Sequence, residues 1–233
     1  MSIFAKCEKY TLARELQAAG IYAFFVPIEE ATATEARVDG EWKVMVGSNN
    51  YLGLTHHPHV LEAARAALTR FGSGSTGSRL LNGTLTLHDE LEERLAQLFR
   101  KPAALVFTTG YQANLGAIAS LVGREDHVFL DRLDHASIVD GARLSYGQLH
   151  RYPHGDAESL ARQLGSVPKS AGKLVVTDGV FSMEGTVAEL PSLIASAKQH
   201  DATILVDEAH AIGVFGATGA GTAEHFGVSD QVD

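Results

Sequence analysis

The chain has 233 residues, of which 45% are hydrophobic and 20% are charged, a composition typical of a globular protein with one large core or of part of a larger two-domain protein. A formal net charge of −9 disfavours nucleic acid or an anionic membrane as the main partner, because binding to either depends on cationic side chains. The single cysteine, Cys7, excludes an internal disulfide framework and a multi-cysteine zinc site, and is typical of a reducing compartment.

Residues 1–45 are expected to form an N-terminal helix and an arm. Leu12 and Leu16 lie at helical spacing, and Gly20 is a stop signal. The first residues carry charges at short intervals and lack the apolar run of a signal peptide. No stretch of the chain has the run of about 18 apolar residues that a membrane span needs. We therefore expect a cytoplasmic protein.

The second part of the chain, residues 46–233, shows apolar strands that alternate with helices. A short strand is predicted in "WKVMVGS" (42–48), just at the boundary. Helices are predicted over 58–71, over 86–99 with Thr84 or Thr86 as cap, over 111–122, from near 134, and near 190–200. Strands are predicted over 103–107, 127–131, 173–178 and 203–207. The alternation predicts an α/β fold with a mostly parallel sheet and helices on both faces.

A glycine-rich segment follows the helix over 58–71. Gly72, Gly74 and Gly77 have the spacing G-x-G-x-x-G of loops that bind a dinucleotide. In such loops the first glycine follows a strand and the last one begins a helix, whereas here a helix precedes the glycines and "SRLLNGT" follows them. The context therefore disfavours dinucleotide binding.

Polar residues stand where the predicted strands end, and ligands of parallel sheets bind at that edge. Thr109, Gly110 and Tyr111 lie between a strand and a helix, where backbone N–H groups hold a phosphate or a threonine caps the helix. Asp207 would need a cationic partner if buried, and with His210 it could orient a heteroaromatic ring. Alternatively, Asp207 caps the next turn and His210 packs nearby; a metal site is a weaker alternative.

Two further strand ends carry candidate ligand groups. The imidazole of His135 could stack on a planar ligand or move a proton, or it could be an exposed neighbour of an Asp134 cap. The hydroxyl of Ser182 could donate to a ligand oxygen, or belong to an ordinary turn. The histidines of "THHPH" surround a helix start without a carboxylate or cysteine at ligand spacing, so we expect no metal site there.

The motifs together resemble the α-oxoamine synthases, a family of pyridoxal phosphate (PLP) enzymes of fold type I. The similar segments are "GSNNYLGLTHHP", "FGSGSTGSRLLNGT", "HDELEERLAQLF", "FTTGYQANLGAI", "LDHASIVDGARLS", "VVTDGVFSMEG" and "LVDEAHAIGVFGATGAG". They cover about residues 44–230, so residues 46–233 would be the front part of the PLP-binding large domain. The resemblance implies a lysine that forms a Schiff base, in a T-x-S-K type motif after "GVSDQVD", and a C-terminal small domain. The chain ends at Asp233, before either of them.

The resemblance also implies roles for individual residues. His135, Asp207 and His210 would be catalytic. His135 would stack on the cofactor ring, Asp207 would pair with the pyridine nitrogen, and His210 and Ser182 would contact the phenolic oxygen. Thr109, Gly110 and Tyr111 would hold the cofactor phosphate. Asn49 would bind the carboxylate of the amino acid. An anionic Asp207 would keep the ring nitrogen protonated, so that the ring could accept an electron pair from the substrate.

The family condenses an amino acid with an acyl-CoA thioester and releases CO₂ and the thiol. The residues of these motifs favour serine and a long-chain acyl-CoA as the substrates. Alanine with a pimeloyl thioester and glycine with acetyl-CoA are the alternatives. The glycine-rich segment would lie at a homodimer interface, beside active sites shared by two subunits. A PLP-dependent lyase or aminotransferase of the same fold, and a non-catalytic subunit without the lysine, remain as further alternatives.

Overall fold

The computed structural model describes residues 2–233, which divide into two units, residues 2–70 and 71–233. In the first unit, α1 (Ala5–Glu8) and α2 (Leu12–Ala18) precede a hairpin-connected sheet. This sheet has the order β1-β2-β3 and is antiparallel. Its strands are β1 (Glu30–Ala31), β2 (Glu35–Val38) and β3 (Glu41–Val44). The short 3₁₀ helix η1 (Leu54–His56) leads into α3 (Pro58–Phe71). The division at residue 45 stays a prediction.

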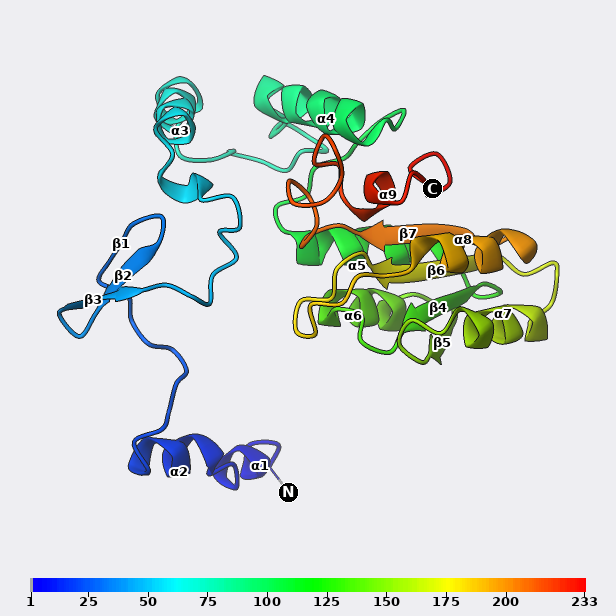
Figure 1. The fold of residues 1–233 in the computed structure, drawn as a ribbon, viewed down its shortest axis with the longest axis horizontal. Coiled ribbons are helices and arrows are strands. Elements are labelled where there is room, and N and C mark those ends of the chain that lie inside the picture. The colour runs from blue at the N-terminus through cyan, green and yellow to red at the C-terminus, as the bar shows by residue number, and fades with distance from the viewer. Residues whose placement is uncertain (1) are drawn as a thin grey trace. The chain divides into compact units, whose positions relative to one another are not determined.

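The second unit is built around a parallel sheet with the order β5-β4-β6-β7 (Figure 1). Its strands are β4 (His127–Asp131), β5 (Gln148–Tyr152), β6 (Lys173–Asp178) and β7 (Thr203–Asp207). Its helices are α4 (Thr86–Phe99), α5 (Gly110–Leu121), α6 (Ala136–Leu144), α7 (Ala157–Ser166), α8 (Leu190–Gln199) and α9 (Thr222–His225). The expected α/β fold is confirmed.

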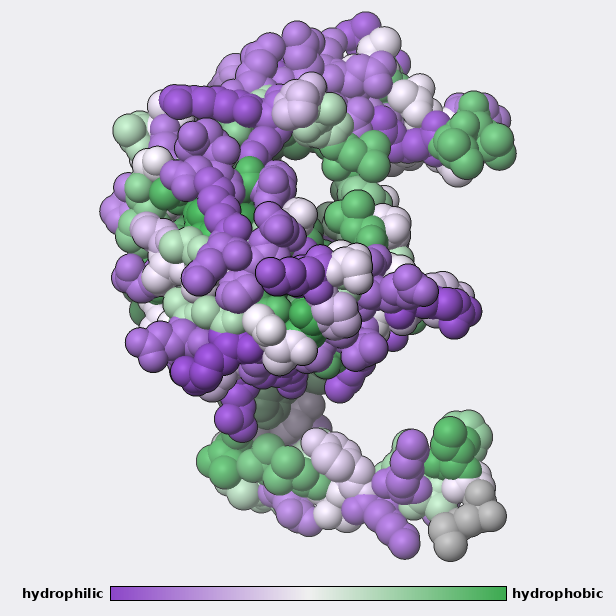
Figure 2. All heavy atoms as spheres, turned by 90° about the vertical axis from the view of Figure 1, so that its right-hand side faces the viewer, coloured by the Kyte–Doolittle hydropathy of each residue, from purple (hydrophilic) through white to green (hydrophobic). Residues whose placement is uncertain are grey.

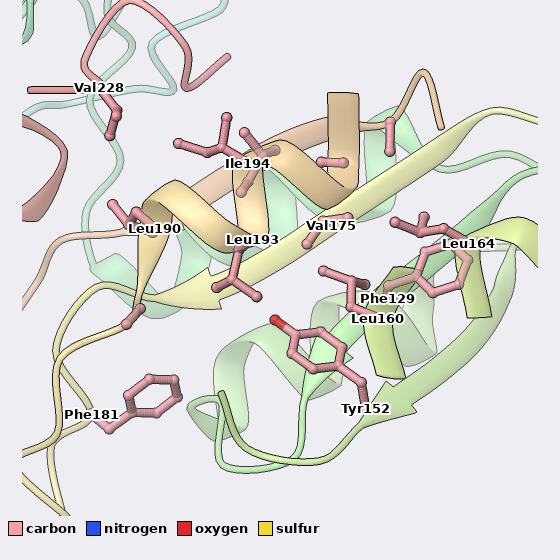
Figure 3. Packing of buried hydrophobic residues seen from close by; sticks show 14 residues of the cluster. Phe129, Tyr152, Leu160, Leu164, Val175, Phe181, Leu190, Leu193, Ile194 and Val228 are labelled. Carbon is pink, nitrogen blue, oxygen red and sulfur yellow. The ribbon is translucent and has the colours of Figure 1, made fainter. Parts of the chain in front are cut away.

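Two apolar clusters pack on the sheet, because residues of β4 and β6 are buried on both faces. One cluster joins Phe129, Tyr152 and Val175 to α7 and α8 (Figure 3). The other joins Val128, Leu130, Leu174 and Val176 to α5 and α6. On the face shown in Figure 2, hydrophilic residues predominate. None of the helices in the described part of the chain is long and apolar enough to cross a bilayer.

The strand expected over 103–107 is wrong, since these residues form no ladder within the described chain. The backbone groups of Val106 bind side chains instead: its N–H donates to Glu92 Oε1 at 2.7 Å, and its carbonyl accepts from Arg79 at 3.1 Å. The cap expected for α4 is also wrong. The N-cap residue is Leu85, whose N–H donates to His88 Nδ1, while the Thr84 hydroxyl donates to Arg79 O at 2.7 Å.

Candidate active site

The carboxyl ends of β6 and β7 and the first turns of α5 and α6 border one cavity of about 660 Å³ within the second unit. Five residues expected at the site line it: Gly110, Tyr111, His135, Asp207 and His210. Asn114, Ser137 and Asp178, polar residues for which no role is predicted from the sequence, also line the cavity. From this end the cavity continues along β7, between Thr203–Val206 and apolar residues of α4.

Asp207 ends β7 and is paired in register with Asp178 of β6. Its Oδ2 accepts a hydrogen bond from Asn114 Nδ2 at 2.7 Å, and its Oδ1 accepts one from the Ala209 N–H at 2.9 Å. Both donors are neutral, and no cationic side chain of residues 2–233 forms an ion pair with Asp207. Each carboxylate oxygen keeps a further lone pair, so the group can still bind a cationic N–H in the cavity.

His135 is the N-cap residue of α6, and its ring folds back over the first turn of that helix. Nδ1 lies 2.7 Å from Ser137 Oγ and accepts the Ser137 N–H at 3.2 Å. The backbone N–H of His135 donates to Asp178 Oδ2 at 2.8 Å. These bonds fix both the backbone and the ring, and within residues 2–233 they leave Nε2 as the ring nitrogen without a hydrogen-bond partner.

Three buried carboxyl groups, those of Asp131, Asp134 and Asp178, lie at this edge of the sheet. Asp134 accepts the N–H of Asp131 at 2.8 Å and that of Asp178 at 3.0 Å. Burial raises the pKa of Asp134 well above its usual value, and the neighbouring Asp178 and Asp131 add to this. Burial also raises the pKa of Asp178 to about 6, and the negative charges of Asp207 and Asp131 act in the same direction. The hydrogen bond from the His135 N–H acts in the opposite direction and lowers this pKa. Asp134 therefore ties strand ends together and is not the cap of α6 considered from the sequence, since the N-cap residue is His135.

The N-terminus of α5 offers backbone donors to the cavity. Thr109 caps the helix, since its hydroxyl oxygen accepts the Gln112 N–H at 3.1 Å. The N–H groups of Gly110 and Tyr111 have no acceptor among the described residues and can bind an anion with the favourable end of the helix dipole. The Tyr111 hydroxyl donates to Asp140 of α6, and this hydrogen bond raises the pKa of Tyr111.

Glu208 holds the turn after β7. Its carboxylate accepts the N–H and the hydroxyl of Thr222 at 2.9 and 2.7 Å and the N–H of Ala223 at 3.0 Å. Side chains would not fit beside it: a Cβ on Gly179 would lie 2.6 Å from Glu208 Oε2, and one on Gly221 would lie 2.5 Å from Glu208 Cδ. Glu208 thus fixes the segment that carries His210.

The remaining expected site residues are not among those that line the cavity. Thr109 makes the cap described above, and Ser182 is exposed in the turn after Phe181. Asn49 belongs to the first unit, where its Oδ1 accepts from the Tyr51 hydroxyl at 3.4 Å. Their roles at the site stay predictions. No three histidine, cysteine or carboxylate side chains of residues 2–233 gather as metal ligands.

The arrangement suits a planar ligand that carries a cationic ring nitrogen and a phosphate. Asp207 can bind the nitrogen, the imidazole of His135 can lie against the ring, and the N-terminus of α5 can bind the phosphate.

Comparison with known proteins agrees with this chemistry. At 49% identity over 224 residues, the chain is similar to a serine palmitoyltransferase from Sphingobacterium spiritivorum, and at 47% over 226 residues to an 8-amino-7-oxononanoate synthase from Citrifermentans bemidjiense. Both matches cover 96% of this chain, but only 56% and 58% of the relatives. The resemblance to the α-oxoamine synthases is thereby confirmed, and the chain spans somewhat more than half the length of these curated relatives.

A solved structure gives the same result for the fold. It is a serine palmitoyltransferase from S. paucimobilis with a bound PLP–myriocin aldimine, 40% identical, with a TM-score of 0.97. The match covers 100% of this chain and 59% of that one. In addition, residues 42–233 match the model of a family described as aminotransferase class I and II. Since this match takes in most of the chain, the protein belongs to the aminotransferase class I and II family.

Proposed function

We propose that the complete protein is a PLP-dependent acyltransferase that condenses serine with a long-chain acyl-CoA, as serine palmitoyltransferases do. The observation that carries the proposal is Asp207, a carboxylate whose hydrogen-bond donors among the described residues are neutral, in one cavity with His135. The four relatives with this name at 46–49% identity support the choice of substrates. The product would then belong to sphingolipid biosynthesis.

The residues of the cavity fit the cofactor. Asp207 would bind the pyridine N–H, His135 would stack on the ring, and the N–H groups of Gly110 and Tyr111 would bind the phosphate. We keep His210 and Ser182 as partners of the phenolic oxygen, Thr109 as a phosphate ligand and Asn49 as a ligand of the amino-acid carboxylate. When bound, PLP supplies an electron sink for the pair left by a departing proton or carboxylate. Asp207 contributes by holding the ring nitrogen in its protonated form.

We further propose that the protein is a cytoplasmic homodimer in which two subunits share the active sites. The glycine-rich segment, residues 72–83, supports this, because it is an irregular surface segment next to α4 that the sequence resemblance assigns to a subunit interface.

A second candidate is 8-amino-7-oxononanoate synthase. Four relatives of that name are 45–47% identical to the chain, close to the values for the serine palmitoyltransferases. The amino acid and acyl group decide between the two, because the cofactor chemistry is the same.

The test uses the full-length protein with added PLP. We expect a visible absorbance band that disappears on borohydride reduction, and release of thiol from palmitoyl-CoA in the presence of serine. Alanine with pimeloyl-CoA as the preferred pair would favour the second candidate, and glycine with acetyl-CoA would favour a 2-amino-3-ketobutyrate-CoA ligase. A protein that binds PLP but releases no thiol with any pair would be a lyase, an aminotransferase or a non-catalytic subunit.

Two variants test the role of Asp207. Asp207→Asn should fold normally and lose at least about a hundredfold in kcat, because the ring nitrogen would no longer face a negative charge. His56→Ala is the control, since His56 lies in η1 and is not among the residues that line the cavity. Near-normal turnover of Asp207→Asn would contradict the proposed electron sink.

A further inference from the structure

Asn114, in the second turn of α5, joins two parts of the site that lie far apart in the sequence. It is buried, and its Nδ2 lies 2.7 Å from Asp207 Oδ2 and 2.8 Å from Ser137 Oγ. An ionised carboxylate can only accept hydrogen bonds, so the atom of Asn114 that faces Asp207 must be its amide nitrogen. The two hydrogens of that nitrogen then serve the two acceptors, one each.

Ser137 extends this chain of hydrogen bonds to His135. Because the Ser137 oxygen accepts from Asn114, its own hydrogen is free to donate to His135 Nδ1, which lies 2.7 Å away. The backbone N–H of Ser137 also points at Nδ1, at 3.2 Å. A nitrogen that faces two donors is an acceptor, so the proton of the neutral imidazole must be on Nε2.

The packing of α6 against α5 makes these contacts possible. Gly141 of α6 faces α5 so closely that a Cβ at this position would lie 3.0 Å from the backbone oxygen of Asn114. Ser137 is buried one helical turn before Gly141. Both polar side chains are therefore enclosed, where hydrogen bonds are strong and a missing partner is costly.

We propose that Asn114 is a positioning residue that acts on both ring-facing groups: it donates to Asp207 directly and, through Ser137, sets His135 in the Nε2–H tautomer. The inference rests on the proposed function for the ligand that Asp207 and His135 contact. In this state His135 presents an N–H donor to the cavity, and Asp207 keeps its carboxylate orientation without a competing cation.

The test reads the tautomer of His135 in the full-length protein labelled with ¹⁵N-histidine. Long-range proton–nitrogen correlation spectra distinguish a protonated Nε2 from a protonated Nδ1, and the signals of His135 are assigned by their loss in His135→Gln. We expect the wild type to show Nε2–H with a bare Nδ1. In Ser137→Ala, where the backbone N–H at 3.2 Å is left to donate to Nδ1, and in Asn114→Leu, whose side chain has the same number of heavy atoms, we expect a larger share of the Nδ1–H tautomer than in the wild type. The control is Ser120→Ala, at an exposed hydroxyl of the same helix α5 that donates to Ala117 O.

A kinetic measurement separates the two arms of Asn114. Asn114→Leu removes the donor to Asp207 as well as the one to Ser137, so we expect kcat to fall roughly tenfold to a hundredfold, as for other groups that orient a functional side chain. KM for acyl-CoA should change little. Ser137→Ala leaves the bond to Asp207 and should lower kcat less than Asn114→Leu.

Two results would overturn the inference: an Nδ1–H tautomer in the wild type, or the wild-type tautomer in both variants. Ser137→Ala removes one hydroxyl and keeps the test decisive if Asn114→Leu does not fold. The spectra need neither cofactor nor substrate. A failure of the proposed function would instead appear in the wild type as absent visible absorbance or absent thiol release, with the tautomer unaffected.

Discussion

Four aspartates at the carboxyl end of the sheet differ in what they bind. Asp131, Asp134 and Asp178 are buried and accept backbone N–H groups: Asp131 and Asp178 bind segments that follow strands, and Asp134 binds the last residues of β4 and β6. Asp178 and Asp207 both line the cavity, and of the four Asp207 is the one that is only partly buried. The first three therefore hold the site in shape, and Asp207 is the carboxylate that is left for a ligand.

The ionised carboxylate of Asp178 should lower the free energy of unfolding above pH 6. Its pKa is raised from 3.8 to about 6, mainly by burial. A group with a raised folded-state pKa stabilises the fold below its unfolded pKa, and this contribution is lost as the pH rises through the folded value. Asp178→Asn keeps an acceptor for the His135 N–H without the charge. We expect it to be more stable than the wild type at pH 8, by on the order of 2 kcal/mol, and to differ little at pH 4.

Urea unfolding between pH 4 and pH 8 measures this difference. Asp230→Asn is the matched control, because Asp230 is an exposed carboxyl group outside the site. A difference between Asp178→Asn and the wild type that does not grow with pH would show that the carboxyl group ionises freely in the folded protein.

At the level of single residues, the sequence predicts the groups at strand ends better than the groups that hold them. Gly110, Tyr111, His135, Asp207 and His210 line the cavity because ligands of parallel sheets meet the carboxyl ends of the strands. The contact of Asn114 with Asp207 spans 93 residues and follows from the packing of helix on sheet. One signal was present: an asparagine inside the apolar helix "ANLGAIASLV" must find a partner when it is buried.

Among the elements, the glycine-rich segment depends on close contacts within itself. A Cβ on Gly83 would lie 1.8 Å from the Gly77 carbonyl oxygen, and a Cβ on Gly77 would lie 1.8 Å from Asn82 Oδ1. The turn so formed carries Arg79, whose guanidinium group pairs with Glu92 of α4. The Arg79 guanidinium and the Val106 N–H lower the pKa of Glu92 to about 2.

Two alanine substitutions in this segment should therefore differ. Gly83→Ala places a methyl group against the backbone of Gly77 and should lower the free energy of unfolding by about 2 kcal/mol or more. Gly74→Ala should be neutral or slightly stabilising, because Gly74 has a negative φ and no atom within 4 Å of its Cβ position. Thermal or urea unfolding of the two variants measures the difference. Equal effects would mean that the turn relaxes at little cost.

Element prediction succeeded where the hydrophobic pattern is continuous. The strands over 127–131, 173–178 and 203–207 and the helix over 58–71 have the expected bounds. Strand β5, "QLHRY", was missed because this edge strand has only two apolar residues, Leu149 and Tyr152, and shows no continuous apolar run, and α7 was missed with it. The segment 103–107 has the composition of a strand, but a strand needs a partner for its backbone groups, and the composition does not supply one.

On the scale of the whole molecule, β7 is an edge strand among the described residues, although it is apolar and lies beside the cavity. Ile204 shows which backbone groups point outward: its N–H donates to Asp233 Oδ2 at 2.9 Å, and its carbonyl accepts from the Asp233 N–H at 3.2 Å. Because alternate residues of a strand point to the same side, the N–H and carbonyl of Val206 face this edge as well. An exposed apolar edge of this kind favours pairing with further chain.

We therefore expect the edge of β7 to be covered in a protein of the length of the relatives, of which this chain spans 56–59%. Hydrogen exchange of the Val206 amide measures this directly, in residues 1–233 expressed alone and in the full-length protein. The amide should exchange at least about a hundredfold more slowly in the longer protein, because opening would then break a ladder hydrogen bond and expose the apolar cavity. The Val175 amide, in the central strand β6, should be protected in both proteins and is the internal reference. Equally fast exchange of Val206 in both would show that the remaining length packs elsewhere and leaves the cavity open along β7.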